Sequence, residues 1–397
     1  MRFLQMYKKN LLVITNSYPK QDFSYIDGVF VNKQIKYLKN FFDNVYVISP
    51  VAYGVELLRK TTLHDYQYDN VKVFFPKYVN FPFFYFYGRS FWIFLETRAI
   101  ISVIKREKIN FNLIHAHFTW PSGAVAVKLK KLYNVPVVIT EGGSTTLHTA
   151  LRRLNRYFID TYHQSDIIIR NNKKDIPLFI KSGIDRNKII HVEYGYDNKK
   201  YYPIPKNESR KMIGVASKKR IILNIGRLSD EKGQKYLIEA MNTIVKKIPD
   251  VICYIGGTGP AHDTLQKQIV ASHLEDTVKL IGFVPDESMS LWMNSADLFV
   301  LPSLAEGNPT VMFECLGCGI PFIGTKVGGI PEVINSDDYG LLVDPGNSND
   351  LAEKILMGLE CEWDRNKILQ YADQYSSENI SKQIMSIYNS ITNGLIS

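Results

Sequence analysis

The chain lacks the features that mark membrane-spanning and disulfide-bonded proteins. No uninterrupted apolar run reaches the roughly 18 residues that a membrane-spanning helix requires. The apolar run after the basic first ten residues is short and leads to Asn16, Ser17 and Pro19 rather than to a small-residue cleavage site. Only four cysteines occur in 397 residues, and they form no disulfide framework. These absences predict a cytoplasmic protein in a reducing compartment.

Two of the cysteines lie close together. Cys315 and Cys318 are separated by two residues, a spacing found in redox pairs and in one half of a zinc site. Neither a second cysteine pair nor a nearby histidine supplies the remaining zinc ligands. The pair is therefore interpreted as two small side chains on a packed helix, and no metal site is predicted.

Acidic residues are scarce in the first half. Residues 1–200 contain 30 Lys and Arg against 15 Asp and Glu, a net charge of +15, whereas the remaining residues contain 18 against 24, a net charge of −6. A basic half joined to an acidic one indicates an anionic partner on one side only. A membrane surface, a nucleic acid, a phosphorylated acceptor and a merely soluble surface are the alternatives.

Short apolar runs recur along the first half, and each ends in polar residues, as buried parallel strands do. Longer segments with helical spacing separate them, among them residues 28–40 and 122–133. The predicted strands are residues 11–16, 45–49, 71–75, 113–116 and 135–140. This alternation predicts a parallel sheet with helices on both faces.

The pattern restarts in the second half. Strands are predicted at 220–225, 251–256, 278–281, 298–301, 321–324 and 341–343, and helices at 234–247, 261–272 and 310–318. Residues 194–217 are rich in Pro, Asn, Gly and Lys without an apolar period, which predicts a linker. Because 397 residues exceed what one core usually fills, we predict two doubly wound domains facing each other across a ligand. They span residues 1–197 and 198–374, and a C-terminal helix at about 375–397 packs back on the first.

Two carboxylates follow the strand predicted at residues 298–301. Glu306 lies in a loop with Gly307 and Pro309, and Glu314 lies about one turn inside the next helix. In an open α/β sheet, ligands bind beyond the carboxyl ends of the strands, where this loop is expected. Gly307 lets the backbone approach a ligand closely, and the free N–H groups at the helix start can hold an anionic or hydroxyl-rich group. A carboxylate such as Glu314 suits the two hydroxyls of a ribose.

Other predicted strands also end in glycine-containing loops. The loop after residues 220–225 carries Arg227 and Lys232, two cations of the kind that a diphosphate requires. Residues 256–259 form a glycine loop that is a weak signal by itself, and residues 282–285 and 324–332 end further strands.

Taken in order, these loops resemble glycosyltransferase family 4, a large family of retaining enzymes with the GT-B fold. The resemblance covers most of residues 220–345 and rests on Gly-Arg-Leu-x-x-Glu-Lys-Gly, Gly-x-Gly, Gly-Phe-Val, Pro-Ser-x-x-Glu-Gly-x-Pro, Glu-x-x-x-x-Gly-x-Pro and Gly-Gly-x-Pro-Glu. It implies a hexosyltransferase whose substrate is a nucleotide-sugar, UDP- or GDP-linked, with no cofactor. The acceptor would be a saccharide or a lipid-linked molecule in cell-surface polysaccharide or glycan synthesis, bound on the side of the first domain.

The resemblance also implies residue roles. Arg227 and Lys232 would bind the donor diphosphate, Glu314 the ribose, and Glu306 the transferred sugar. The backbone around Phe283 and Val284 would hold the base. The expected catalytic residues are His117, Glu306, Arg227 and Lys232, and the expected donor site comprises Gly28, Gly226, Arg227, Lys232, Gly257, Phe283, Val284, Glu306, Gly307, Asn308, Pro309, Thr310 and Glu314. No Asp-x-Asp occurs, so cations and helix N-termini rather than a metal would neutralise the leaving diphosphate.

The first half resembles the family more loosely. Gly28 follows the first predicted strand, where family members carry a glycine loop, and the absence of G-x-G-x-x-G argues against a dehydrogenase. His117 matches the active-site histidine that contacts the sugar, and His115 is expected to point back into the sheet. Family members often carry His-Gly-x-Asp after the next strand. This chain has Glu141 in place of that histidine, which leaves acceptor and sugar specificity open.

Residues 78–95 are dense in aromatic side chains and are flanked by Lys77, Arg89 and Arg98. Such a segment suits an interfacial element on an anionic bilayer, although Pro82 and Gly88 prevent one continuous helix. Packing of a loop and a helix in the core is the alternative. Together with the charge of the first half, the segment favours a lipid-linked acceptor and a peripheral position on the cytoplasmic face of a membrane.

Other functions share these features. A nucleotide-sugar epimerase could use the same scaffold. A non-catalytic sugar-nucleotide sensor or subunit would be marked by loss of the phosphate cations or of the glutamate pair, and all of them are present. No nucleic-acid recognition motif accompanies the basic half, so no nucleic-acid partner is predicted.

Overall fold

The computed structural model describes residues 9–392 apart from residues 26, 57–60, 81–87, 143–144 and 216–217. Contacts within the chain divide it into two compact units. Unit 1 comprises residues 1–192 together with 381–397, and unit 2 comprises residues 193–380. The sequence prediction placed the first division after residue 197 and the return to the first domain at about residue 375.

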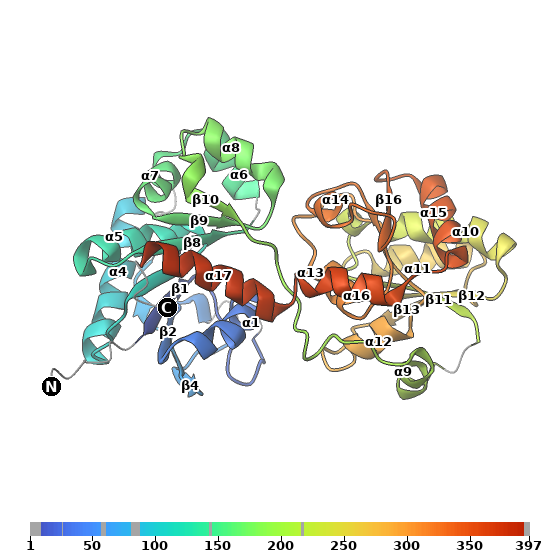
Figure 1. Ribbon diagram of the computed structural model, residues 1–397, viewed down its shortest axis with the longest axis horizontal. Coiled ribbons are helices and arrows are strands. Elements are labelled where there is room, and N and C mark those ends of the chain that lie inside the picture. Colours follow the sequence, from blue (N-terminus) through green and yellow to red (C-terminus); the bar gives the residue numbers. More distant parts are fainter. Residues whose placement is uncertain are drawn as a thin grey trace. The chain divides into compact units, whose positions relative to one another are not determined.

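Unit 1 is built on an eight-stranded sheet whose strands are parallel except for the edge strand β4 (Figure 1). β1 buries Leu11, Leu12, Val13 and Ile14 almost completely, because helices cover both faces of the sheet. In sheet order the strands are β10 (Ile189–His191), β9 (Ile167–Arg170), β8 (Val137–Glu141), β7 (Leu113–His117), β1 (Asn10–Thr15), β2 (Asn44–Ile48), β5 (Val71–Phe74) and β4 (Tyr66–Tyr68), with β3 (Val51–Ala52) and β6 (Lys77–Tyr78) as a separate pair.

The helices of unit 1 lie on the two faces of this sheet. α4 and α5 bury Ile100 and Val125 in the core on the face of Leu12 and Ile114. On the opposite face, Tyr388 of α17 contacts His115. The helices are α1 (Val29–Leu38), α4 (Arg89–Arg106), α5 (Ala124–Tyr133), α6 (Thr145–Arg152), α7 (Arg156–Gln164), α8 (Ile176–Lys181) and most of α17 (Ser377–Ile391).

Unit 2 is a second doubly wound unit with a six-stranded parallel sheet. Its strands in sheet order are β13 (Val278–Gly282), β12 (Val251–Gly256), β11 (Arg220–Ile225), β14 (Leu298–Leu301), β15 (Phe322–Thr325) and β16 (Gly340–Val343). Its helices are α9 (Lys206–Met212), α10 (Gln234–Lys247), α11 (His262–Ala271), α12 (Met289–Ser295), α13 (Thr310–Gly317), α14 (Ile330–Val333), α15 (Ser348–Glu360) and α16 (Arg365–Asp373).

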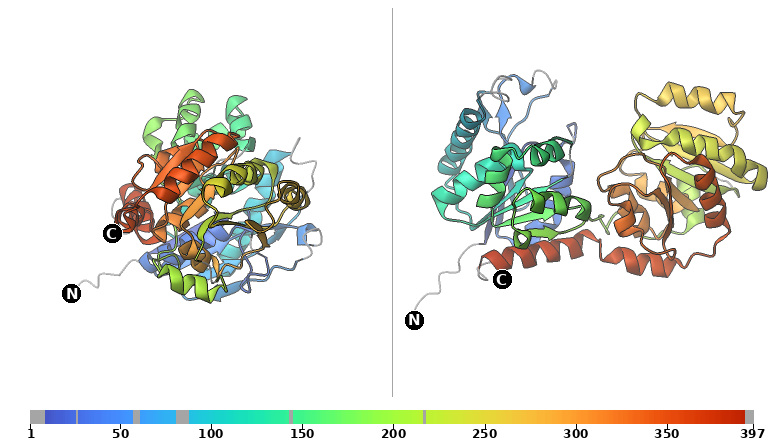
Figure 2. Two further views of the ribbon diagram at one scale, coloured as in Figure 1. Left: turned by 90° about the vertical axis from the view of Figure 1, so that its right-hand side faces the viewer. Right: turned by 90° about the horizontal axis from the view of Figure 1, so that it is seen from above.

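Alternate residues along the strands of unit 2 belong to two separate hydrophobic cores, one on each face of the sheet. Phe299 and Phe322 pack against α12, α13 and α16, whereas Val300 and Ile323 pack against α10, α11 and α15. Figure 2 shows the helices of unit 2 on both faces of its sheet. This alternation confirms the predicted doubly wound architecture within each unit. The other predicted strands and helices are present with ends that shift by one or two residues, and the C-terminal helix predicted at about 375–397 is α17, which ends at Ile391.

The linker prediction for residues 194–217 was wrong for much of that segment. Tyr196 and Tyr201 are buried in the core of unit 2, at 6% and 2% exposure. α9 follows, and its Arg210 donates to Asp297 at 2.8 Å and to the carbonyl of Ser295 at 2.9 Å. These contacts could not be predicted from the sequence, because two isolated aromatic residues and one arginine hold the segment in place. Such contacts leave no periodic apolar pattern.

The aromatic segment predicted at residues 78–95 lies partly outside the described residues. From Arg89 onward it forms α4, which begins directly after Gly88. Its aromatic side chains do not share one environment. Phe91 and Phe94 are exposed, as an interfacial element would require, whereas Trp92 turns inward, as packing in the core would require. Within the described part of the chain, no helix combines the length and hydropathy that crossing a membrane requires.

Candidate active site

In unit 2 the order of the strands reverses at β11, which pairs with β12 on one side and β14 on the other. The loops that follow β11 and β14 therefore meet at the carboxyl edge of the sheet, the usual ligand site of such folds. The amide of Leu304 donates to the carbonyl of Glu231 at 2.7 Å and joins the two loops. Gly233 is required there, because a Cβ on it would lie 2.1 Å from the carbonyl oxygen of Pro302.

Lys232 and Glu306 form an ion pair across these two loops. Lys232 Nζ lies 2.7 Å from Glu306 Oε1, which also accepts from Ser303 Oγ at 2.7 Å. The side chain of Glu306 is only 6% exposed, and that of Lys232 is 22% exposed. Among the described residues, Oε2 of Glu306 makes no hydrogen bond. The sequence-predicted cation and carboxylate are thus brought together, and one carboxylate oxygen is left for another donor.

Arg227 lies two residues after the end of β11 and is exposed. Its carbonyl accepts from Gln234 at 3.0 Å, which fixes the backbone of the loop. Its guanidinium has neither an ion pair nor a hydrogen bond within the part of the chain that the structure describes. A charged side chain at a strand end with no protein partner can bind a phosphate.

The loop after β15 packs against the loop that carries Glu306. The amide of Gly329 donates to the carbonyl of Gly307 at 2.7 Å. Gly328 has a φ of +55°, and a Cβ on it would lie 2.3 Å from the carbonyl oxygen of Glu306. The Gly-Gly pair therefore does more than form a turn, since it holds the backbone of Glu306 and Gly307 in place.

Glu314 is buried inside α13 at 6% exposure. The hydroxyl of Tyr201 hydrogen-bonds to it, and burial raises the pKa of that tyrosine. Pro309 occupies the N-cap position of α13, so the helix begins at Thr310 immediately after the loop of Glu306. Asn308 of the same loop is tied to Glu193 by its side-chain amide.

The remaining predicted donor residues follow the next two strands. The amide of Gly226 donates to the carbonyl of Gly256 at 3.0 Å, and a Cβ on Gly257 would lie 1.9 Å from the carbonyl oxygen of Gly226. After β13, Phe283 is 72% exposed whereas Val284 is buried. The structure therefore gathers all the predicted residues of this unit at the carboxyl ends of β11 to β14.

The two closely spaced cysteines are buried around the end of α13. Both are free, and Cys315 Sγ donates to the carbonyl of Ile320 at 3.2 Å. Burial raises the pKa of Cys318 to about 12. Both thiols therefore stay protonated at neutral pH, which agrees with the interpretation of packed side chains.

In unit 1 the strand order reverses between β1 and β7, and two predicted residues lie there. Gly28 has a φ of +78°, and a Cβ on it would lie 2.2 Å from the carbonyl oxygen of Ser17, so no larger residue fits. His117 ends β7 and is 2% exposed. Neither of its ring nitrogens has a partner among the described residues. Burial lowers the pKa of His117 to about 3, so the imidazole is neutral.

His115 takes a structural position, as expected from its place in the strand. It is fully buried, and its ring nitrogens contact Thr140 Oγ1 at 2.7 Å and the hydroxyl of Tyr388 at 2.6 Å. The ring of His117 stacks on it with centroids 4.5 Å apart. His115 therefore supports the ring of His117 from below, whereas His117 keeps both of its nitrogens for a ligand.

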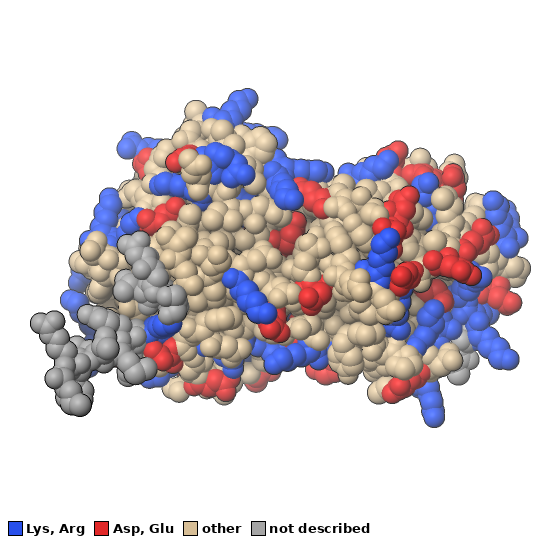
Figure 3. All heavy atoms as spheres, viewed as in Figure 1, with Lys and Arg blue, Asp and Glu red and all other residues tan. Residues whose placement is uncertain are grey.

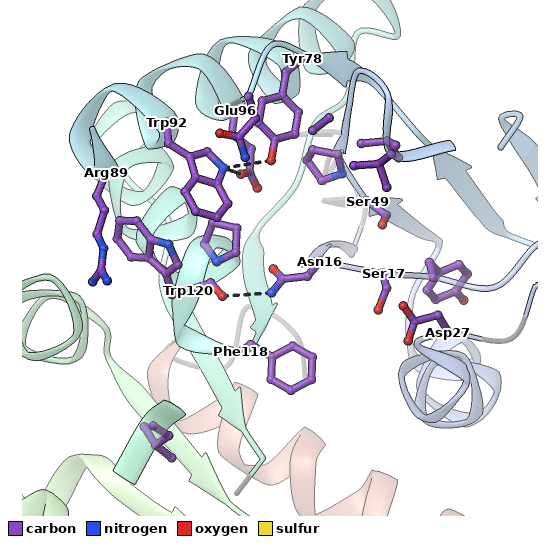
Figure 4. Close-up of a pocket in the computed structure, with 18 of the residues that line it drawn as sticks. Asn16, Ser17, Asp27, Ser49, Tyr78, Arg89, Trp92, Glu96, Phe118 and Trp120 are labelled. Carbon is purple, nitrogen blue, oxygen red and sulfur yellow. Dashed lines mark hydrogen bonds between the residues drawn. The ribbon is translucent and has the colours of Figure 1, made fainter. Parts of the chain in front are cut away.

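A cavity of about 1030 Å³ opens beyond the strand ends of unit 1. Its walls include Asn16, Trp92, Glu96, Trp120 and Glu141, and Asn16 Nδ2 donates to the carbonyl of Trp120 at 3.0 Å (Figure 4). Of these residues, the sequence singled out Glu141 alone for a site. The others come from three different segments, which no local motif connects.

Glu96 is the least expected member of the cavity wall. It is 1% exposed in the middle of α4, and its Oε2 accepts from Trp92 Nε1 at 3.0 Å. The same indole N–H lies 2.9 Å from the hydroxyl of Tyr78 (Figure 4). Burial raises the pKa of Glu96 to about 8, so this carboxyl is largely protonated at neutral pH. The available signal in the sequence was a glutamate one helical turn from the apolar residues Trp92, Ile93 and Ile100.

Two family models match the chain, one for each half. "Glycosyltransferase Family 4" matches residues 28–200, and "Glycosyl transferases group 1" matches residues 205–375. TuaC of Bacillus subtilis, a glycosyltransferase assigned to teichuronic acid biosynthesis, is 28% identical over 360 residues that cover 87% of this chain and 88% of TuaC. D-inositol 3-phosphate glycosyltransferase of Corynebacterium urealyticum is 26% identical over 327 residues, 74% of this chain and 75% of that protein.

A solved structure shows the same fold. Anabaena HepE in complex with UDP superposes with a TM-score of 0.73 at 23% identity, over 96% of this chain and 100% of HepE. The family matches agree with the strand-end loops of unit 2 and with the doubly wound sheets of both units. The chain therefore belongs to the group 1 glycosyltransferases of family 4 and is a transferase with the GT-B fold.

Proposed function

We propose that this glycosyltransferase moves a sugar from a nucleotide-sugar donor to a saccharide or lipid-linked acceptor with retention of anomeric configuration. The observation that carries the proposal is the pair of Lys232 and Glu306 at the reversal of strand order in unit 2, beside the exposed guanidinium of Arg227. The two cations, Arg227 and Lys232, match the diphosphate of such a donor. The carboxylate of Glu306, whose Oε2 makes no hydrogen bond among the described residues, matches its sugar hydroxyls.

The donor would bind along the carboxyl edge of the unit 2 sheet. Arg227 and Lys232 hold the diphosphate, and Glu306 with the amides of residues 307–310 holds the transferred sugar. Glu314 holds the ribose hydroxyls from inside α13, and the backbone of residues 283–284 holds the base. The HepE structures with UDP and with UDP-glucose share the fold, so a UDP-sugar is the first donor to assay and a GDP-sugar the second.

The proposed chemistry needs no protein nucleophile. The acceptor oxygen attacks the anomeric carbon from the face on which the diphosphate leaves, and a donor phosphate oxygen takes the acceptor proton. The negative charge that develops on the leaving diphosphate is stabilised by Arg227 and Lys232, without a metal. His117, a neutral imidazole whose two nitrogens have no partner among the described residues, would hydrogen-bond a sugar hydroxyl.

The test is a screen of the purified protein against UDP-, GDP- and ADP-sugars with and without EDTA. Donor hydrolysis is measured by chromatography of the released nucleotide, and binding by thermal stabilisation. We expect one donor class to bind and to be hydrolysed slowly, with no effect of EDTA. Conversion of the donor to its epimer in the absence of acceptor would identify an epimerase instead. Donor binding without turnover toward any acceptor would identify a non-catalytic subunit.

The acceptor would reach the cavity of unit 1, and we propose an anionic membrane surface near it. α4 exposes Phe91 at 50% and Phe94 at 45%, and the guanidinium of Arg98 lies 5.6 Å from the centroid of the Phe94 ring. Figure 3 shows further Lys and Arg side chains over unit 1. The burial of the individual residues adds that Lys173 and Lys181 of this unit are exposed. Exposed aromatic rings beside cations are typical of an interfacial helix. A lipid-linked acceptor in cell-surface polysaccharide synthesis would fit this surface.

Liposome flotation tests the membrane proposal. The wild type should float with vesicles that contain anionic lipid, less so at high salt, and the double substitution Phe91→Ser and Phe94→Ser should reduce flotation. Equal flotation of the wild type with neutral and anionic vesicles, or none with either, contradicts it.

A further inference from the structure

The wall of the unit 1 cavity contains two buried carboxyl groups that the proposed chemistry does not use, besides the exposed Asp27. Glu96 and Glu141 are 1% and 3% exposed, and both line the cavity. They come from α4 and from the end of β8, so the fold brings them to one space from distant parts of the chain. A buried carboxyl group costs folding free energy unless it is hydrogen-bonded, which makes the partners of these two groups informative.

Glu141 is held on one side only. Its Oε2 accepts from the amide of Thr119 at 2.7 Å, from the hydroxyl of Thr119, and from the hydroxyl of Tyr162 at 3.3 Å. Its Oε1 forms no hydrogen bond with any residue for which the structure gives a position. One carboxylate oxygen of a buried, firmly held side chain is thus available at the cavity wall.

The surroundings of Glu141 keep it in place without neutralising it directly. Arg170, which is fully buried, donates to the backbone carbonyl of Glu141 rather than to its carboxylate. A second nitrogen of Arg170 lies 2.5 Å from Asp175 Oδ2, so this cation already has an anionic partner. Burial raises the pKa of Glu141, while its bonds to Thr119 and the charge of Arg170 oppose that rise.

The cavity also carries an aromatic surface. The ring of Trp120 lies edge-to-face with Trp92 at 5.9 Å and stacks on Phe158 at 6.3 Å. Trp120 Nε1 is buried and has no hydrogen-bond partner among the residues described. Aromatic side chains beside hydrogen-bonding carboxyl groups in one cavity wall suit a sugar ring and its hydroxyls.

Two arginines also line the cavity, but they do not make it a site for an anionic acceptor. The guanidinium of Arg89 lies 5.8 Å from the centroid of the Trp120 ring and 5.8 Å from that of the Tyr157 ring, so these two rings cover the planar guanidinium group. Arg153 is exposed. An anionic acceptor bound against Glu141 would meet like charge or force this carboxyl to stay protonated, whereas Glu96 is largely protonated already.

We propose that the cavity binds an uncharged sugar ring of the acceptor and that Glu141 selects it by accepting a hydrogen bond from one ring hydroxyl through Oε1. The inference rests on the proposed function, because it assigns the acceptor of the same transfer.

The substitution Glu141→Gln tests the assignment. The amide oxygen of glutamine can keep the bonds from Thr119, while its NH₂ group replaces Oε1 and turns an acceptor into a donor. Glu107→Gln is the matched control, because Glu107 is an exposed carboxylate of unit 1 that pairs with Arg106. Binding of methyl glycosides of glucose, galactose and N-acetylglucosamine is titrated by saturation-transfer NMR, with glucuronate and inorganic phosphate as anionic probes.

We expect at least one neutral glycoside to bind the wild type and Glu107→Gln equally, and Glu141→Gln to weaken it about 10- to 100-fold. Equal binding by Glu141→Gln, or binding of the anionic probes alone, or no binding of any neutral glycoside overturns the proposal. Unchanged thermal unfolding of Glu141→Gln separates loss of binding from loss of fold. Since these titrations contain no donor, a failure of donor hydrolysis would count against the proposed function and not against this site.

Discussion

Replacement of Lys232 by methionine tests the donor site most directly, because it removes the charge and keeps most of the aliphatic stem. In the structure Lys232 Nζ lies 2.7 Å from Glu306 Oε1 and is 22% exposed. Ser303 Oγ still donates to the same oxygen after the substitution. Glu306 therefore keeps one partner, and we expect a stability loss of about 1–3 kcal/mol rather than unfolding.

The larger effect should be on transfer. A positioned group that stabilises transition-state charge contributes about 2.7–4 kcal/mol, which corresponds to about 100- to 1,000-fold in kcat. Lys232→Met should therefore lower kcat by this factor at saturating donor, with a smaller change in the KM for donor. Lys232→Arg should recover part of the loss because it restores the charge with a different geometry.

The assay is the initial rate of nucleotide release, with and without acceptor, at several donor concentrations. Lys235→Met is the control, since Lys235 is an exposed cation three residues further on that lies over the ring of Tyr236 at 4.9 Å. A folded Lys232→Met enzyme with kcat within threefold of the wild type would refute the assignment of Lys232 to the leaving diphosphate.

Further substitutions probe the other groups. Glu314→Ala should raise the KM or Kd for donor about tenfold or more and leave kcat less affected, and equal donor affinity in a titration would contradict the ribose role. Gly28→Ala should lower the thermal midpoint by several degrees, because its Cβ would lie 2.2 Å from the carbonyl oxygen of Ser17; an unchanged melting curve would show that the loop relaxes. Glu96 has a pKa raised to about 8, so the folded state retains a proton that the unfolded state loses above about pH 4.5. Wild-type stability should therefore fall relative to Glu96→Gln as pH rises from about 4.5 to 8, by at most about 1.4 kcal/mol per pH unit in urea titrations, and parallel curves would exclude this explanation.

Most of the residues that we propose for the donor could be predicted because they lie in loops that follow strand ends. A buried parallel strand is visible as an apolar run, and the residue that follows it lies at the ligand edge of the sheet. Arg227 and Glu306 are therefore placed by local sequence alone. Their proximity could not be read from spacing, because it depends on β11 and β14 being neighbours although β12 and β13 separate them in the chain.

The cavity of unit 1, which we propose for the acceptor, could not be predicted from the sequence for the opposite reason. Glu96 lies seven residues inside α4, counted from Arg89, where neither a strand end nor a glycine loop marks it. Its role depends on Trp92 one turn earlier and on Tyr78 from a separate strand. The burial of Tyr196 and Tyr201, in the segment predicted as a linker, could not be predicted for a similar reason. Single buried aromatic residues leave no periodic pattern in the sequence.

The hydrogen bond between Tyr388 and His115 joins residues that are 273 positions apart, and both belong to unit 1. During synthesis the first 192 residues leave the ribosome long before α17 does. One face of β7 therefore lacks α17, the helix that packs on it, until all of unit 2 has been translated. Native contacts of such high sequence separation slow folding. Unit 1 is accordingly the part of the protein that should depend on chaperones while translation is in progress, and unit 2, formed from one continuous stretch, can complete its fold first.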